Sequence, residues 1–153
     1  MRQTTMPRAL KNAERRWFVL DAAGKPVGRV AAEAVRILKG KYRPTYLPFL
    51  DMGDYVIVIN AEKAIFTGRK WEQKYYYHHS GYEGGLRLTR AKDMLREHPT
   101  RILEHAIKGM LPKNPLGRQM GRKLFVYAGP DHPHEAQRPV LWEGPQTLLK
   151  GGE

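Results

Sequence analysis

The continuous apolar run at residues 55–60, Tyr-Val-Ile-Val-Ile-Asn, most constrains the fold of this chain. A strand with one side in solvent alternates apolar and polar residues, whereas a strand covered on both faces is apolar throughout. Valine and isoleucine also favour extended backbone on a packed sheet surface. The run therefore predicts a central strand, with other strands beside it and a covering layer on each face.

Helices are predicted where apolar residues recur at steps of three and four. The clearest covers residues 28–40, and Gly40 stands where a helix C-cap glycine belongs. A second is predicted at 89–98, and a third runs from Thr100 as N-cap to Leu111. Further short strands are predicted at 16–21, 64–67, 75–79 and 124–127.

The order of strand, helix, strand, later helices and strand is typical of the α/β class. Right-handed crossovers between parallel neighbours would put helices on both faces of the sheet. We therefore predict a small three-layer α/β/α sandwich around a mostly parallel sheet of about four strands, with basic loops and extended termini. A single domain is expected at 16–139, between a basic N-terminal arm at 1–15 and a C-terminal tail at 140–153.

The net charge of +12, from 27 Lys and Arg against 15 Asp and Glu, indicates a polyanionic partner. Self-repulsion on this scale destabilises a compact monomer, and nucleic acid, an anionic membrane face or a large acidic protein would relieve it. A basic enzyme remains the plainer alternative. No apolar stretch approaches the length of a membrane span. The absence of cysteine excludes disulfides, thiolate metal sites and cysteine nucleophiles, and it suits a reducing cytoplasm.

The segment 108–123 carries five positive charges and no negative one. Its glycines and prolines predict a bent path, along which cations could follow a folded RNA backbone by phosphate contacts that read little sequence. A solvated loop is the alternative, but apolar residues such as Leu111 and Met120 indicate that the segment is anchored. The candidate RNA contacts here are Lys108, Lys113, Arg118, Arg122 and Lys123.

Two further basic clusters contain aromatic residues. Rings among cations can stack on unpaired bases, or they can pack beneath the loop that carries them. Both interpretations stay open for Tyr42, Tyr46 and Trp71. The candidate RNA contacts in these clusters are Arg36, Lys39, Lys41, Tyr42, Arg43, Arg69, Lys70 and Lys74.

Four histidines suggest a metal site only weakly. His78, His79, His132 and His134 lack accompanying cysteines, and their spacing does not match common zinc sites. We predict that they bind no metal and instead donate to RNA phosphates or stack on bases. No cofactor is expected.

Catalytic motifs are weak. The glycine-containing loop at 24–29 lies between a strand and a helix, where phosphate loops occur, but it lacks their Gly-Lys-Ser/Thr ending. A small nucleotide enzyme is therefore the alternative function. Asp51 and Asp54, on either side of Gly53, are better explained as a structural turn than as an acid–base pair. No catalytic residue is predicted.

Lys-Gly-Met-Leu-Pro-Lys at 108–113, followed by Leu-Gly-Arg at 116–118, is the most specific of several stretches that match the motifs of one known family. Together these stretches resemble the bacterial large-subunit ribosomal protein L-thirteen family. The resemblance covers residues 16–139. The other matching stretches are 17–22, 28–31, 51–61, 74–81, and Tyr-Ala-Gly at 127–129 with His132, His134 and 136–137.

The resemblance implies a non-catalytic, three-layer α/β protein that binds 23S rRNA and enters the large subunit early in assembly. It implies neighbouring large-subunit proteins as partners and a place in the cytoplasmic ribosome, with no membrane contact. Translational repression through messenger RNA bound at the same surface is a further hypothesis, compatible with the first.

Overall fold

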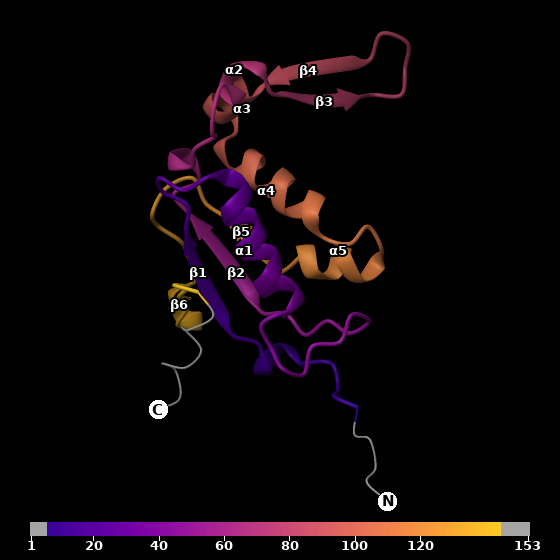
Figure 1. Cartoon of the computed structure of the whole chain (residues 1–153), viewed down its shortest axis with the longest axis vertical. Coiled ribbons are helices and arrows are strands. Elements are labelled where there is room, and N and C mark those ends of the chain that lie inside the picture. Colours follow the sequence, from indigo (N-terminus) through magenta and orange to yellow (C-terminus); the bar gives the residue numbers. More distant parts are fainter. Residues whose placement is uncertain (1–5, 145–153) are drawn as a thin grey trace, which may run out of the picture.

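A four-stranded parallel sheet forms the centre of the molecule in the computed structural model, which describes residues 6–144 (Figure 1). The strand order is β5-β2-β1-β6. The predicted α/β class and mostly parallel sheet are confirmed. The strands are β1 (Trp17–Asp21), β2 (Tyr55–Ile59), β5 (Leu124–Val126) and β6 (Val140–Leu141).

Strand β2 is covered on both faces, as its apolar run predicts. Val56, Ile57 and Val58 are all fully buried, although consecutive side chains point to opposite faces. Strand β1 pairs with β2 and also buries three consecutive residues, Phe18, Val19 and Leu20, so it too is covered on both faces. The strongest sequence signal therefore marks the centre of the sheet.

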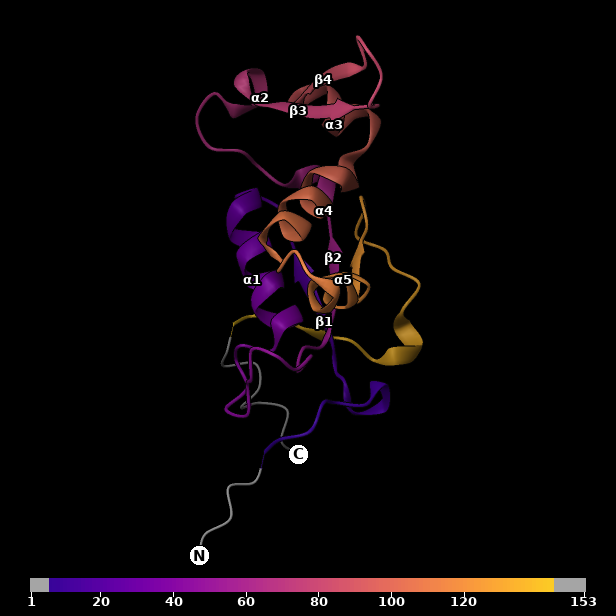
Figure 2. The same ribbon diagram turned by 90° about the vertical axis from the view of Figure 1, so that its right-hand side faces the viewer.

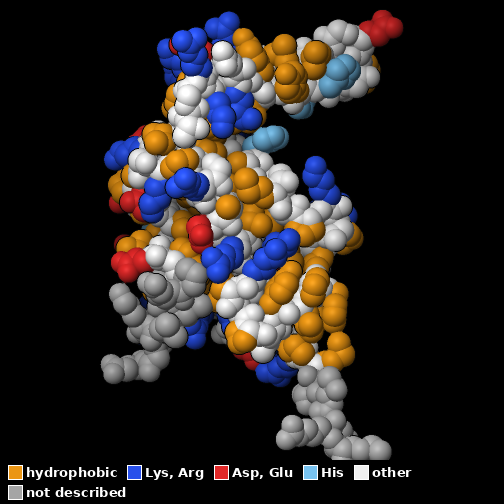
Figure 3. Space-filling model, viewed as in Figure 1, with side chains coloured by type: hydrophobic (Ala, Val, Ile, Leu, Met, Phe, Trp, Pro, Cys, Tyr) orange, Lys and Arg blue, Asp and Glu red, His pale blue; other side chains and the backbone are white. Residues whose placement is uncertain are grey.

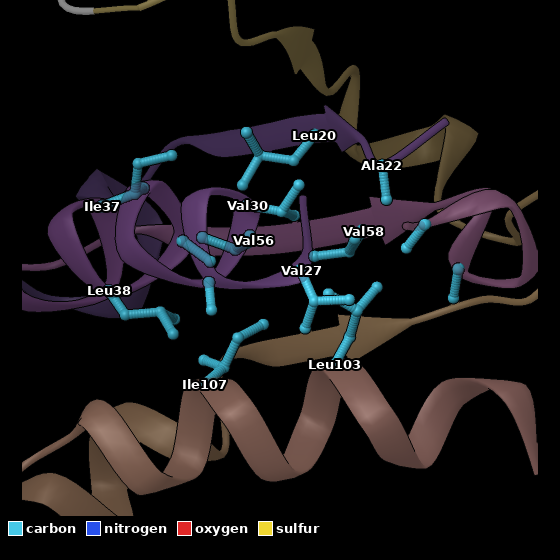
Figure 4. Close-up of a cluster of buried hydrophobic side chains, with 14 of the residues drawn as sticks. Leu20, Ala22, Val27, Val30, Ile37, Leu38, Val56, Val58, Leu103 and Ile107 are labelled. Carbon is cyan, nitrogen blue, oxygen red and sulfur yellow. The ribbon is translucent and has the colours of Figure 1, made fainter. Parts of the chain in front are cut away.

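Two long helices, α1 (Val27–Lys39) and α4 (Pro99–Met110), cover one face of the sheet. Their apolar stripes meet the side chains of β1 and β2 in one cluster, where Ile37, Leu103 and Ile107 are fully buried (Figure 4). Burying such a side chain contributes about 1.5–3 kcal/mol. Helix α1 ends as predicted at Gly40, whose φ of 74° closes the last turn.

The second face is covered by the segment at 127–139, which contains only a short 3-10 helix, η3 (Glu135–Gln137) (Figure 2). Here Trp17 stacks on Tyr55 with ring centroids 4.3 Å apart, and His134 lies over Trp17 at 5.1 Å. Helices were expected on both faces. The connections from β1 to β2 and from β2 to β5 both contain helices and move in the same direction across the sheet, so right-handed crossovers place these helices on one face. The connection from β5 to β6 runs in the opposite direction and therefore crosses the other face.

An antiparallel hairpin projects beyond the sheet and α4 (Figure 1). It is formed by β3 (Tyr75–His79) and β4 (Leu86–Arg90), between α2 (Lys70–Gln73) and α3 (Ala91–Glu97). Strand β4 was not predicted, and it takes the first residues of the helix expected at 89–98. The strand expected at 64–67 is reduced to one bridge between Pro26 and Ile65.

Two helix predictions near α4 need correction. Helix α4 begins at Pro99 with His98 as N-cap, so Thr100 lies inside the first turn. Part of the segment predicted as a loop forms a helix, α5 (Pro115–Gly121). The remaining short elements are the 3-10 helices η1 (Asn12–Glu14) and η2 (Ala61–Lys63).

The folded body extends beyond the predicted boundaries at both ends. The Arg15 side chain is 7% exposed, although the arm was expected to reach residue 15. Strand β6 pairs with β1, and Trp142 packs edge-on against Phe18 at 5.1 Å. Residues 140–142 therefore belong to the domain rather than the tail; the rest of the predicted tail from 145 lies outside the described residues, as do residues 1–5 of the arm. None of the helices in the described part is long and apolar enough to span a bilayer.

Candidate nucleic-acid interface

A cationic surface hollow of about 570 Å³, here called the basic groove, lies between the end of α4 and α5. Four of the five cations predicted in segment 108–123 line it, and no carboxylate does. Its floor is apolar, from Leu111 and Pro112. The lining residues are Lys108, Leu111, Pro112, Lys113, Gly117, Arg118, Gly121 and Arg122.

A tight turn between α4 and α5 shapes the basic groove. The Asn114 side chain accepts a hydrogen bond from the Gly117 amide at 2.8 Å, and Pro115 occupies the first helical position. Gly117 lies so close to the preceding backbone that a Cβ there would be 1.7 Å from the Pro112 carbonyl oxygen. Arg118 lies on α5 and Arg122 is its C-cap residue, four positions later, so both lie on the same side of this short helix.

The charges in the basic groove are mostly uncompensated. Lys108 has a partly exposed partner in Glu104, with 3.6 Å between Nζ and Oε2. Lys113, Arg118 and Arg122 are exposed, and none forms an ion pair within residues 6–144. The groove therefore presents a positive potential with hydrogen-bond donors, which suits a phosphate backbone.

A second hollow, of about 480 Å³, lies beneath the projecting hairpin and is here called the hairpin hollow (Figure 3). It adjoins the basic groove, because Lys108 lines both. Burial raises the pKa of Tyr76, whose ring meets His105 edge-on at 5.4 Å. Its lining residues are Tyr76, Tyr77, His78, Arg87, Thr89, Met94, Arg101, Glu104, His105 and Lys108.

Sequence reasoning missed most of the hairpin hollow. Arg101, Glu104, His105 and Lys108 follow helical spacing on the polar face of α4, a signal that was present in the sequence. Arg87 lies on the strand that was not predicted. Only His78 and Lys108 of the predicted contacts line this hollow.

Lys123 and Arg43, two predicted RNA contacts, instead belong to a buried ion cluster made by Arg15, Arg43, Asp51, Asp54 and Lys123. The Lys123 ammonium lies 2.6 Å from Asp51 Oδ1, donates to the Leu38 carbonyl at 3.2 Å and is 7% exposed. Arg43 bonds both oxygens of the fully buried Asp54, at 2.8 and 2.9 Å. Lys123 thus has no access to RNA, and Arg43 is committed to an internal pair.

Burial dominates the electrostatics of this ion cluster. It raises the pKa of Asp54 to about 6, against the opposing effects of the Arg16 amide hydrogen bond and the nearby Lys123 charge. Burial likewise lowers the pKa of Lys123, and Asp51 opposes that shift. Asp51 and Asp54 are therefore both engaged in internal ion pairs, Asp51 with Arg15 and Lys123 and Asp54 with Arg43.

Two aromatic residues of the other basic clusters, Tyr42 and Trp71, pack inward. Tyr42 lies edge-on to Phe18 at 6.2 Å and tilted against Trp142 at 5.5 Å, so its partly buried ring packs against the core. Trp71 packs on Phe66 at 4.8 Å and anchors its loop. The remaining cations line neither the basic groove nor the hairpin hollow: Arg36, Lys39, Lys41, Arg69, Lys70 and Lys74.

The two histidine pairs lie on different elements and do not converge. His79 Nδ1 accepts a hydrogen bond from the Gly81 amide in the hairpin. On the second face of the sheet, His134 Nε2 lies 2.7 Å from the Tyr127 hydroxyl, and burial together with the charge of His132 lowers the pKa of His134. Across residues 6–144, no group of acidic and histidine side chains is arranged to hold a metal ion.

The loop between β1 and α1 does not form a phosphate cradle. The Val27 amide donates to the Ile65 carbonyl, and the Arg29 and Val30 amides donate to Pro26, so these groups are occupied. The adjoining hollow is lined by the carboxylates of Asp21, Glu33 and Glu143 as well as by cations. A nucleotide phosphate would meet like charge there, which disfavours the enzyme hypothesis.

The fold and its surfaces define a small, strongly basic, parallel α/β protein with a cationic groove at the end of its helical layer. A family profile described as Ribosomal protein L13 matches residues 15–133. The chain belongs to the ribosomal protein L13 family, which confirms the resemblance found in its sequence. This is a family of structural proteins, not of enzymes.

Relatives named Large ribosomal subunit protein uL13 match along most of their length. The protein of Agathobacter rectalis is 56% identical over 130 residues, which cover 85% of this chain and 92% of the relative. That of Natranaerobius thermophilus is 53% identical over 144 residues, which cover 94% of this chain and 100% of the relative. That of Acholeplasma laidlawii is 58% identical over 130 residues, which cover 85% of this chain and 92% of the relative.

Proposed function

We propose that this protein is a structural constituent of the large ribosomal subunit and binds 23S rRNA through the basic groove, mainly by phosphate contacts. Its place of action is translation, in the cytoplasmic ribosome. The observation that carries this proposal is the set of four cations around an apolar floor with no carboxylate among them. The names of the relatives support the ribosomal role.

Counterion release gives the proposed contact a measurable signature. Each phosphate that a cation neutralises contributes about −0.9 to the slope of log affinity against log salt concentration. This is the coefficient for duplex DNA, which we apply to duplex RNA. Four groove cations that each neutralise one phosphate would give a slope of about −3.6. The expected binding therefore weakens steeply with salt.

Arg118→Ala is expected to lower the affinity for 23S rRNA about tenfold, because it removes one charge-assisted hydrogen bond. It should also make the salt slope shallower by about 0.9. Filter binding to 23S rRNA over a series of KCl concentrations measures both quantities.

Lys63→Ala provides the matched control, since Lys63 is an exposed cation on η2 that lines neither hollow. It should leave the slope unchanged. Binding that is insensitive to salt, or equal losses in the two variants, would contradict the proposed groove.

Phosphate contacts carry little sequence information, so the same groove would accept other structured RNAs. A messenger RNA bound by this protein would then compete with 23S rRNA for one site. Competition between the two RNAs, together with a similar loss of affinity for both in Arg118→Ala, would support a shared site in the basic groove.

We further propose that the protein enters the subunit early, beside neighbouring large-subunit proteins. Depleting it from cells is expected to accumulate precursor particles that also lack later proteins, because the RNA it holds would stay unorganised. Quantitative mass spectrometry of sedimented particles measures this outcome. Full-sized subunits that lack this protein alone would contradict early entry.

A further inference from the structure

The hairpin hollow differs chemically from the basic groove that it adjoins. One wall comes from the inner face of the hairpin, and the other from α3 and the polar face of α4. Three cations, Arg87, Arg101 and Lys108, line it, and so do the rings of Tyr76 and His105. A surface that served only phosphates would not need the rings.

Glu104 is the distinguishing residue of the hairpin hollow. Among the residues that line the two hollows, it is the single carboxylate. Its Lys108 partner lies 3.6 Å away and both side chains are at least a third exposed, so this pair contributes little to folding. Glu104 therefore places a negative charge in a surface that otherwise attracts phosphate.

An ionised carboxylate only accepts hydrogen bonds, so an RNA group facing Glu104 must be a donor. Phosphate oxygens are excluded by like charge. RNA offers two kinds of donor: the ribose 2′-hydroxyl, which presents a single O–H, and the amino and imino groups of its bases, which are accessible when a base is unpaired. Guanine presents an imino and an amino donor side by side, and these match the two oxygens of one carboxylate.

The walls of the hollow suit an inserted base. Tyr76 and His105 meet edge-on at 5.4 Å, and the Lys74 ammonium lies 5.3 Å from the centroid of the Tyr76 ring, which fixes that ring from outside the hollow. Met94 also lines the hollow and adds apolar surface. Aromatic and apolar walls with one polar acceptor are the usual form of a base-binding site.

We propose that the hairpin hollow binds an unpaired guanine of the RNA whose backbone lies in the basic groove, with Glu104 accepting hydrogen bonds from the base. This proposal rests on the proposed function, because Lys108 joins the two hollows and the phosphates next to the base would reach the groove cations. The protein then reads one base within a contact that is otherwise independent of sequence.

Four RNA hairpins that differ only in one unpaired nucleotide, G, A, C or U, test this assignment. Fluorescence anisotropy with the full chain at one salt concentration should give about tenfold tighter binding for G than for U, the size of one bidentate base contact. Uracil should bind weakest, because two carbonyls flank its single imino donor.

Glu104→Ala should abolish this preference and leave the salt slope in place. Glu97→Ala is the matched control for lost negative charge: Glu97 is an exposed carboxylate on α3 that lines neither hollow, and its removal should preserve the preference for G. Arg118→Ala should weaken all four RNAs alike.

Each outcome separates the two proposals. Equal binding of the four RNAs by the wild type, or a preference that survives Glu104→Ala, would overturn the base site while the basic groove stands on its salt slope. Loss of the salt slope in the wild type would overturn the proposed function itself. Thermal unfolding of Glu104→Ala should match the wild type, since this side chain lies at the surface of α4.

Discussion

Asp51→Ala is expected to lower the free energy of unfolding by about 3–5 kcal/mol, the cost of leaving buried charges without their counterion. Asp51 contacts Lys123 at 2.6 Å and Arg15 at 3.3 Å, and both basic side chains are 7% exposed. Without the carboxylate, two positive charges would share one buried site. Urea denaturation followed by circular dichroism measures the change.

Asp93→Ala is the control for this effect. Asp93 forms a solvent-exposed pair with Arg96 at 4.0 Å, so its removal should cost less than about 0.5 kcal/mol. Combining Asp51→Ala with Lys123→Met should recover part of the lost stability, because the methionine removes one uncompensated charge. Similar small losses in both aspartate variants would show that water screens the ion cluster.

Gly117→Ala is expected to destabilise the protein by about 3 kcal/mol, since a side chain there would overlap backbone rather than a flexible group. The added Cβ would lie 1.7 Å from the Pro112 carbonyl oxygen. To relieve the overlap, α5 must move away from the turn, which displaces Arg118 from Lys113. The affinity for 23S rRNA should therefore fall together with the thermal midpoint.

Gly109→Ala separates this overlap from the general effect of replacing glycine in a helix. A Cβ at Gly109, inside α4, meets no atom within 4 Å. Alanine there should raise the free energy of unfolding by about 0.5–1 kcal/mol, because it restricts the unfolded chain. If both variants lost stability equally, the close approach at Gly117 would not be the cause.

The elements with strong local patterns were predictable from the sequence. Strand β2 has an apolar run and α1 has a continuous stripe ended by a glycine, and both patterns come directly from burial. Helix α5 was missed because its glycines and prolines favour a loop, although Asn114 followed by Pro115 is a typical helix start. Strand β6 has only two residues, and its place depends on β1.

The candidate site was predictable where it lies on one continuous segment. Lys108, Lys113, Arg118 and Arg122 meet in the basic groove, because a single turn joins their helices. Lys123 was misassigned, since residue type does not reveal that its partner, Asp51, lies 72 positions away. The hairpin hollow needed tertiary structure, because it arises where the hairpin overhangs α4.

The pairing of β1 with both β2 and β6 affects how the chain folds as it is synthesised. The edge of β1 that receives β6 and the ring of Phe18 that contacts Trp142 are made first and covered last. At roughly 5–20 residues per second, their partners follow roughly 6–24 s later. During that interval β1 presents an unpaired edge, and Phe18 lacks its contact with Trp142. An unpaired edge of this kind can pair with the wrong strand until β6 forms.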